Sequence, residues 1–135
     1  MTIITYGTFD LFHYGHYNLL KRARDMGDKL IVGVLTDEMC VEKGKKTVLD
    51  QKKRMEIISN LKFVDKVISE ENMRQKVDDV KKYGVNVLVL GDDYKMSFPK
   101  MEEYGKLIEL GCDVVFLPRT PNISTTYIKN ICKKK

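Results

Sequence analysis

The chain has 135 residues, a formal net charge of +5, 43% hydrophobic residues and 32% charged residues. This length fits one domain of ordinary size, and the composition excludes a disordered or fibrous protein. The longest apolar runs, residues 30–35 and 85–90, are far shorter than the roughly 20 residues that a membrane-spanning helix needs, so no membrane segment is expected.

Short apolar runs alternate along the chain with longer segments of helical spacing. The predicted strands are residues 2–6, 29–35, 64–68, 85–90 and 113–117, and the predicted helices are residues 14–26, 50–61, 73–83, 101–110 and 125–132. Strands that are apolar throughout are typical of parallel sheets buried on both faces. We therefore expect an α/β fold, a single-domain Rossmann-like doubly wound sandwich with a five-stranded parallel sheet and helices on both faces. Residues 1–132 would form this domain and residues 133–135 a basic tail, with ligands bound beyond the carboxyl ends of the strands.

The turn after the first predicted strand combines features of an anion-binding site. Gly7 permits the chain to turn and a ligand to approach the backbone, and the helix start that follows offers a positive dipole end. His13 and His16, the only histidines of the chain, are expected on the same side of that helix start, with Gly15 leaving room for a phosphate. A third metal ligand at a recognisable spacing and an adjacent nucleophile are both missing from the sequence. We therefore interpret the pair as donors to phosphate oxygens rather than as two surface histidines near a turn.

Three further segments carry polar groups suited to a nucleotide. Residues 42–46 place a glycine inside a lysine cluster, which fits a phosphate clamp, although such a loop is also typical of a solvated surface. Residues 119–126 combine Arg119 with hydroxyl side chains before the last predicted helix, and Ser124 also fits an N-cap. The carboxylates in residues 91–94 would accept hydrogen bonds from a cytosine amine or a ribose, or cap the loop.

Three features of the sequence indicate where the protein works and with what partners: the cysteines, the N-terminus and the charge distribution. Cys40, Cys112 and Cys132 fit neither a disulfide framework nor a zinc site, so we interpret them as structural thiols. The first residues show no charged leader and no cleavage site, which leads us to expect a cytoplasmic protein. Because residues 133–135 are three terminal lysines, the net charge alone does not indicate a nucleic-acid partner.

Motifs spread over nearly the whole chain carry a family resemblance. They are Thr5-Tyr-Gly-Thr-Phe-Asp-Leu-Phe-His-Tyr-Gly-His16, Thr36-Asp37-Glu38, Gly91-Asp92-Asp93, Pro118-Arg119-Thr120 and Ile123-Ser-Thr-Thr126. On these residues the chain resembles the H-x-G-H nucleotidyltransferases and, within them, the cytidylyltransferases that act on glycerol 3-phosphate. The closing Arg-Thr-x-x-Ile-Ser-Thr-Thr element narrows the resemblance from the wider group to the cytidylyltransferases.

The resemblance implies an activity and partners. A phosphate oxygen of sn-glycerol 3-phosphate would attack the α-phosphorus of CTP, giving CDP-glycerol and pyrophosphate with no covalent enzyme intermediate. Magnesium would accompany the CTP triphosphate, with no metal site built from protein ligands. The protein would be a homodimer without nucleic-acid or membrane partners, and its product would feed teichoic-acid or capsular polymers.

The resemblance also assigns roles to individual residues. The implied catalytic residues are His13, His16, Lys43, Lys45 and Arg119. The implied CTP-binding residues are Thr8, Phe9, His13, Tyr14, Gly15, His16, Lys45, Asp93, Arg119, Thr120, Ile123, Ser124, Thr125 and Thr126. The implied acceptor-binding residues are Lys43, Lys76, Asp10 and Asp37. Asp10 would hold its loop or a magnesium-bound triphosphate, or only cap the turn, and Asp37 would contact the substrate or orient a lysine.

Some positions depart from the family pattern. Met73 stands where the family has tryptophan, Lys62 where it has arginine and Asn122 where it usually has glycine, and residues 95–105 form a longer stretch. The departures at Met73 and Lys62 fall where the resemblance places the acceptor substrate. The resemblance therefore defines CTP as the nucleotide better than it defines the phosphorylated alcohol that accepts the cytidylyl group. Arg54, which follows two lysines, is expected to be an exposed helix residue.

Two alternatives remain open. In the first alternative, the chemistry is the same but the acceptor is phosphoethanolamine or phosphocholine. A pocket for the cationic nitrogen of these acceptors would offer aromatic faces or carboxylates, and Lys43 and Lys76 do not favour it. A non-catalytic nucleotide or RNA binding module would keep the fold and the basic tail but would not need paired histidines beside a lysine clamp.

Overall fold

The computed structural model describes residues 1–118, so the predicted helix 125–132, the tail 133–135 and the predicted site residues from Arg119 onward lie outside the described residues. The described elements, in chain order, are β1 (Thr2–Gly7), α1 (Tyr14–Asp25), β2 (Lys29–Leu35), α2 (Asp37–Glu42), α3 (Gln51–Ser59), β3 (Lys66–Glu70), α4 (Gln75–Tyr83), β4 (Val87–Gly91), the 3₁₀ turns η1 (Asp92–Tyr94) and η2 (Phe98–Lys100), α5 (Glu102–Glu109) and β5 (Asp113–Leu117).

The five predicted strands and the four predicted helices that fall within residues 1–118 are confirmed, with shifts at some of their ends. β2 and β5 have the predicted bounds, whereas β3 and β4 each begin two residues later than predicted. The strands begin later because the apolar residues before them are still hydrogen-bonded to the end of the preceding helical segment. The Val64 N–H donates to Leu61 O and the Val85 N–H to Val80 O, each at 3.1 Å. Hydrophobicity alone does not distinguish such a helix-closing residue from the first residue of a strand.

The short helix α2 was not predicted from the sequence. Its N-cap is Thr36, whose hydroxyl accepts the Met39 N–H at 3.1 Å. Met39 and Cys40 are its buried residues. Two buried side chains give too little periodicity to indicate a helix, although the threonine cap and the acidic first turn were a usable start signal.

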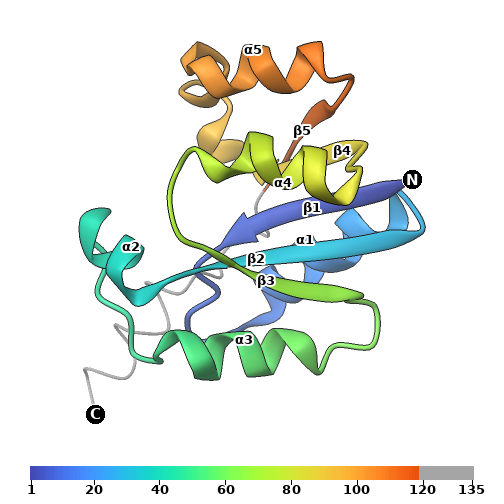
Figure 1. Cartoon of the computed structure of the whole chain (residues 1–135). Coiled ribbons are helices and arrows are strands. Elements are labelled where there is room, and N and C mark those ends of the chain that lie inside the picture. Colours follow the sequence, from blue (N-terminus) through green and yellow to red (C-terminus); the bar gives the residue numbers. More distant parts are fainter. Residues whose placement is uncertain (119–135) are drawn as a thin grey trace.

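The five strands form one parallel sheet in the order β3-β2-β1-β4-β5, as Figure 1 shows. From the central β1 the chain passes through β2 to β3 at one edge, and then returns by α4 to β4 on the other side of β1. The strand order therefore reverses between β1 and β4. In a doubly wound sheet, the crevice beyond the carboxyl ends of these two strands is the expected ligand site.

The sheet separates two apolar clusters. Ile3 packs in a cluster with buried residues of α1 and α3, and its neighbour Ile4 packs with buried residues of α4 and α5. Successive side chains of a strand point to opposite faces, so both faces of β1 are covered. This arrangement confirms the predicted doubly wound sandwich and explains why the strands are apolar throughout.

Two further expectations concern membranes and thiols. Among the helices described in residues 1–118, none combines the length and the apolarity that crossing a membrane requires. Cys40 and Cys112 are free and buried, as predicted for structural thiols, and Cys132 lies outside the described residues.

Candidate active site

The two histidines form the N-terminal cap of α1. The His13 Nδ1 accepts the Gly15 N–H at 3.0 Å, and the His16 Nδ1 accepts the His13 N–H at 3.3 Å. The two rings are stacked, with centroids 3.8 Å apart and an angle of 21° between their planes. The prediction that both side chains lie on one side of the helix start is confirmed.

These hydrogen bonds determine where the ring protons are. Because each Nδ1 accepts a backbone N–H, the proton of each neutral ring is on Nε2. Burial lowers the pKa of His13, which favours its neutral form near pH 7. The cap thus fixes two imidazoles as N–H donors at the positive end of a helix.

A neighbouring side chain explains the glycine at position 7. A side chain at Gly7 would be blocked by the ring of Phe9, because a Cβ there would lie 2.7 Å from a ring carbon. Gly7 therefore leaves room for a buried phenylalanine, and it also lines the cavity described next. Phe9 is only 4% exposed, and its φ of 54° is in the left-handed region. Its backbone, not its ring, is the part suited to contact a nucleotide.

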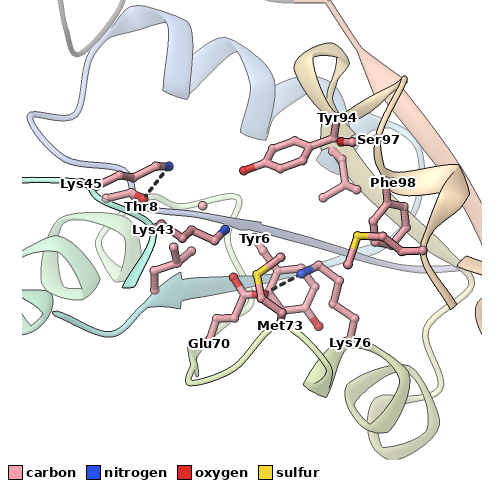
Figure 2. A pocket seen from close by; sticks show the side chains of 14 residues that line it. Tyr6, Thr8, Lys43, Lys45, Glu70, Met73, Lys76, Tyr94, Ser97 and Phe98 are labelled. Carbon is pink, nitrogen blue, oxygen red and sulfur yellow. Dashed lines mark hydrogen bonds and ion pairs between the residues drawn. The ribbon is translucent and has the colours of Figure 1, made fainter. Parts of the chain in front are cut away.

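A cavity of about 130 Å³ lies at the carboxyl edge of the sheet (Figure 2). Tyr6, Gly7 and Thr8 at the end of β1, Leu35 on β2, Glu70 on β3 and Leu90 on β4 line it. Charged side chains from two further segments, Lys43, Lys45 and Lys76, reach the same cavity. Its apolar wall includes Met73, Phe98 and Met101. The cavity occupies the crevice at the strand-order reversal, where the sequence predicted the ligand.

The lysines of the basic loop, residues 42–46, meet the turn after β1. The Lys45 Nζ donates to the Thr8 hydroxyl at 3.3 Å, and the Lys43 Nζ lies 5.9 Å from the ring centroid of Tyr94. Burial lowers the pKa of Lys43, Glu70 raises it, and the ammonium groups of Lys45 and Lys76 lower it. The loop thus contributes to the cavity and is not only a solvated surface.

Lys76 is buried, although a lysine on a helix is usually exposed. Its ammonium lies 2.7 Å from the Glu70 carboxylate and 4.8 Å from the ring centroid of Tyr6. The Tyr6 hydroxyl in turn donates to Asp79 at 2.8 Å. Burial and the adjacent Asp79 raise the pKa of Tyr6. Sequence reasoning missed Glu70, Tyr6 and Asp79, although Glu70 ends a strand at the predicted ligand edge.

Asp10 and its partners hold the turn after β1 against the segment before α3. Asp10 is 2% exposed, and its two oxygens accept the N–H groups of Val48 and Leu49 at 2.8 and 2.9 Å. Asp10 is not among the residues that line the cavity. These contacts support the loop-holding alternative among the roles expected for Asp10.

Arg54 is fully buried, so the prediction of an exposed helix residue is wrong. Its guanidinium donates to Leu49 O at 3.1 Å, to Thr8 O at 2.9 Å and to the Asp37 Oδ1 at 2.8 Å. Each of the three guanidinium nitrogens thus has an acceptor, one of them a carboxylate, which permits burial of the charge. Asp37 also accepts the Gln51 N–H, so it orients an arginine rather than a lysine.

The remaining predicted residues lie around the cavity or outside the described residues. Asp93 folds back toward Gly91, where a Cβ would lie 2.6 Å from its Oδ1, and its neighbour Tyr94 is the residue that lines the cavity. Tyr14 is 63% exposed at the start of α1. Thr8, Lys43, Lys45 and Lys76 are thus brought together in the cavity, whereas the histidine pair begins α1 after the same strand. The predicted residues beyond 118, from Arg119 to Thr126, are outside the described residues.

Comparisons with known proteins match nearly the whole chain. Residues 4–131 match the family described as cytidylyltransferase-like. The chain is 47% identical to a glycerol-3-phosphate cytidylyltransferase of Bacillus spizizenii over 127 residues, which cover 94% of this chain and 93% of that protein. It is 46% identical to a glycerol-3-phosphate cytidylyltransferase of Staphylococcus aureus over 127 residues, 94% of this chain and 91% of that protein. Among solved structures, a lipopolysaccharide core biosynthesis protein of Thermoplasma volcanium matches with a TM-score of 0.72 and 29% identity, covering 89% of this chain and 96% of that one.

Proposed function

The chain belongs to the cytidylyltransferase-like family, and we propose that it transfers the cytidylyl group of CTP to sn-glycerol 3-phosphate, giving CDP-glycerol and pyrophosphate. The observation that carries this proposal is the cavity itself. Three lysine side chains converge there at the carboxyl edge of the sheet, beyond the strand that leads into the histidine cap. Such an arrangement suits two anionic substrates that must be held together.

The reaction needs positioning more than it needs a base. An oxygen of the acceptor phosphate forms a bond to the α-phosphorus of CTP, and the bond from that phosphorus to the bridging oxygen of the β-phosphate breaks. Pyrophosphate leaves with the electron pair of that bond. The acceptor phosphate is already an anion near pH 7, so no proton must be removed from the nucleophile. The protein has to overcome the repulsion between two anions and to stabilise charge on the phosphoryl oxygens.

The histidine cap suits the second task. In our proposal the Nε2–H groups of His13 and His16 donate to phosphate oxygens of CTP as the transition state forms. Their rings are held by backbone hydrogen bonds before substrate arrives, so little reorganisation is needed. The N-terminus of α1 adds its positive end beside Tyr14 and Gly15.

The lysines divide between the two substrates. Lys45, which donates to Thr8, is assigned to the CTP phosphates, and Lys43 and Lys76 to the phosphate of the acceptor. Arg119 and the segment through Thr126 would also hold the nucleotide, as the family resemblance implies. Asp93 is assigned to the nucleoside on the same ground.

Magnesium enters this proposal with the nucleotide, as part of the CTP complex. When bound, it neutralises charge on the phosphate oxygens. Both oxygens of Asp10 already accept backbone N–H groups, so this carboxylate is committed to its loop rather than to a cation. The chain's own contribution is to orient the triphosphate through the histidine cap and Lys45.

A cationic acceptor such as phosphoethanolamine or phosphocholine fits the cavity less well. The cavity does contain a carboxylate, Glu70, and the aromatic rings of Tyr6 and Tyr94. However, the Lys76 ammonium already pairs with the Glu70 carboxylate and lies over the ring of Tyr6, and the Lys43 ammonium lies over the ring of Tyr94. The groups that would attract a quaternary or primary ammonium are therefore engaged by lysines.

The setting of the reaction extends the same proposal. We place the enzyme in the cytoplasm, acting as a homodimer, with CDP-glycerol passing to teichoic-acid or capsular polymer synthesis. The bacterial relatives named glycerol-3-phosphate cytidylyltransferase are consistent with the polymer role, whereas the dimer and the cytoplasmic location rest on the sequence expectations. Sedimentation of the purified protein tests the proposed dimer, for which the expected mass is twice the 15.7 kDa of one chain.

Pyrophosphate release tests the activity. We would measure it for CTP, ATP, UTP and GTP, each with sn-glycerol 3-phosphate, phosphoethanolamine and phosphocholine. Release with CTP and sn-glycerol 3-phosphate above all other pairs is expected. Salt-dependent RNA binding without pyrophosphate release from any pair would instead support the non-catalytic module.

A further inference from the structure

The ion pair between Lys76 and Glu70 is the most deeply buried one among the described residues. Their side chains are 5% and 1% exposed, and the ammonium and carboxylate are 2.7 Å apart. Removing one partner of such a pair leaves an uncompensated charge in a medium that solvates it poorly. Both residues nevertheless line the cavity, so the pair is buried and within reach of a ligand.

Tyr6, on the central strand of the sheet, also contacts the Lys76–Glu70 pair. The ring of Tyr6 lies 4.8 Å from the Lys76 ammonium, and the Tyr6 hydroxyl donates to Asp79. Gln75 donates to the same Asp79 oxygen at 2.9 Å and to Ser69 O at 2.8 Å. The ammonium of Lys76 is therefore held between the Glu70 carboxylate and the ring of Tyr6 at the wall of the cavity, and an ammonium has three N–H donors, of which Glu70 accepts one.

A second ammonium shares this end of the cavity. Lys43 extends toward the same region in Figure 2, between Tyr94 and the Glu70–Lys76 pair. The charged or titratable groups that act on it are Glu70 from β3, Lys45 from its own loop, Lys76 from α4 and the Cys40 thiol from α2. Two lysines so placed repel one another, and Glu70 is the single carboxylate among the described residues that line the cavity.

We propose that Glu70 is a positioning residue for the acceptor phosphate, because its carboxylate holds the Lys76 ammonium at the cavity and offsets the repulsion between Lys76 and Lys43. This inference rests on the proposed function, since it concerns the acceptor end of the same cavity. It runs against the simple Coulomb expectation, in which an acidic group beside a phosphate site only weakens phosphate binding. Here we expect Glu70 to strengthen phosphate binding, because the buried Lys76 ammonium without its partner would turn away from the cavity or lose its proton.

The first test is Glu70→Gln, which keeps the shape of the side chain and removes its charge. We expect the KM for sn-glycerol 3-phosphate to rise by about tenfold or more near pH 8.5, whereas the KM for CTP changes by less than about twofold. The matched control is Glu71→Gln, the same charge change at the exposed neighbour, which should leave both values unchanged. An unchanged or lower acceptor KM in Glu70→Gln would overturn the proposal.

The pH profile separates positioning from a merely structural loss. Glu70 raises the pKa of Lys43, so removing it lowers that pKa further, and the ammonium loses its proton at a lower pH. The ratio of acceptor KM values, variant over wild type, should therefore grow from about pH 7 to about pH 9.5. The ratio also cancels the titration of the acceptor phosphate itself. Glu70→Asp, which keeps the charge, should show a flat ratio. A flat ratio for Glu70→Gln as well would contradict the proposal.

A coupling test covers the case in which Glu70→Gln does not fold. Lys76→Met removes the charge that Glu70 compensates, so the double variant Glu70→Gln/Lys76→Met buries no unpaired ion. In the Lys76→Met background, Glu70→Gln should change the acceptor KM by less than about twofold at about pH 7, the low end of the pH profile, where the loss of Glu70 affects Lys43 least. A further tenfold loss in that background would show that Glu70 acts independently of Lys76 and would refute the inference.

Binding of inorganic phosphate distinguishes this inference from the proposed activity. If the wild type bound phosphate at least about tenfold more tightly than Glu70→Gln at pH 8.5 but released no pyrophosphate, the activity would fail and the positioning role would stand. If the wild type turned over normally and both proteins bound phosphate equally, the positioning role would fail and the activity would stand.

Discussion

The imidazole of His13 caps the helix on which the imidazole of His16 sits, and the two rings stack with centroids 3.8 Å apart. One set of hydrogen bonds therefore starts α1 and orients both rings. Structure and chemistry are coupled at this cap, which gives the first prediction.

His13→Asn separates the two roles of the cap. Asparagine is a good N-cap, so helix α1 should keep its start and the midpoint of urea unfolding should change little. Turnover should nevertheless fall by about a hundredfold or more, because a transition-state donor is lost. His16→Ala should reduce turnover by a similar factor. Turnover of His13→Asn within about threefold of wild type would exclude the donor role.

The lowered pKa of His13 predicts how stability depends on pH. The unfolded chain binds a proton at this residue near the usual value of 6.5, whereas the folded protein binds it only at lower pH. The unfolded state thus takes up more protons, and stability falls as pH decreases below about 6.5. Thermal unfolding between about pH 7.5 and pH 5 checks this, and the slope should be smaller in His13→Asn. An identical slope in the two proteins would argue against the lowered pKa of His13.

The two loop lysines should affect different substrates. Lys43→Ala should mainly raise the KM for sn-glycerol 3-phosphate, and Lys45→Ala, which loses the contact with Thr8, should mainly raise the KM for CTP. Each rise should be about tenfold or more, the scale of a lost charge-assisted contact. Steady-state kinetics with each substrate varied in turn measures both. Lys52→Ala on α3, an exposed lysine outside the cavity, is the matched control. Equal effects of the two loop variants on both substrates would contradict this division.

Arg54 should be essential for stability. Arg54→Met keeps an apolar stem but removes the Arg54 donors from two backbone carbonyls and from the Asp37 Oδ1. We expect a loss of about 3 kcal/mol in the free energy of unfolding, measured in urea. Lys53→Ala, one residue away with its side chain 66% exposed, should cost less than about 0.5 kcal/mol. A loss for Arg54→Met as small as that of Lys53→Ala would show that these contacts contribute little.

Gly7 and Phe9 should be coupled. Gly7→Ala places a methyl group against the Phe9 ring and should cost about 1–3 kcal/mol of stability. In a Phe9→Leu background the ring is absent, so the same substitution should cost clearly less. Urea unfolding of the four proteins gives the coupling. Strict additivity would mean that the ring does not determine the need for glycine at position 7.

The fold was largely predictable because it depends on features that are local in sequence. Uniformly apolar strands predicted a sheet covered on both faces, and the clusters around Ile3 and Ile4 confirm it. The starts of β3 and β4 were not predictable to the residue. Val64 and Val85 are apolar like strand residues, but they close the helical turns before those strands.

The shared position of the histidine pair was predictable from residue type and spacing, whereas the family resemblance, not the lysine pattern itself, indicated that the loop lysines belong to the site. The site was not predictable where a role depends on distant contacts. Arg54 follows two lysines on a helix and has the pattern of an exposed residue, but it donates to Thr8, 46 residues away. Glu70 is an ordinary strand-end glutamate until α4 brings Lys76 beside it.

A crystal structure with CDP-glycerol bound tests the central claim most directly. It should show the cytidine-bearing phosphate beside the Nε2 atoms of His13 and His16 and the Lys45 ammonium. The glycerol-bearing phosphate should lie in the cavity between Lys43 and Lys76. Density for CDP-glycerol elsewhere on the protein, with this cavity unchanged, would contradict the account.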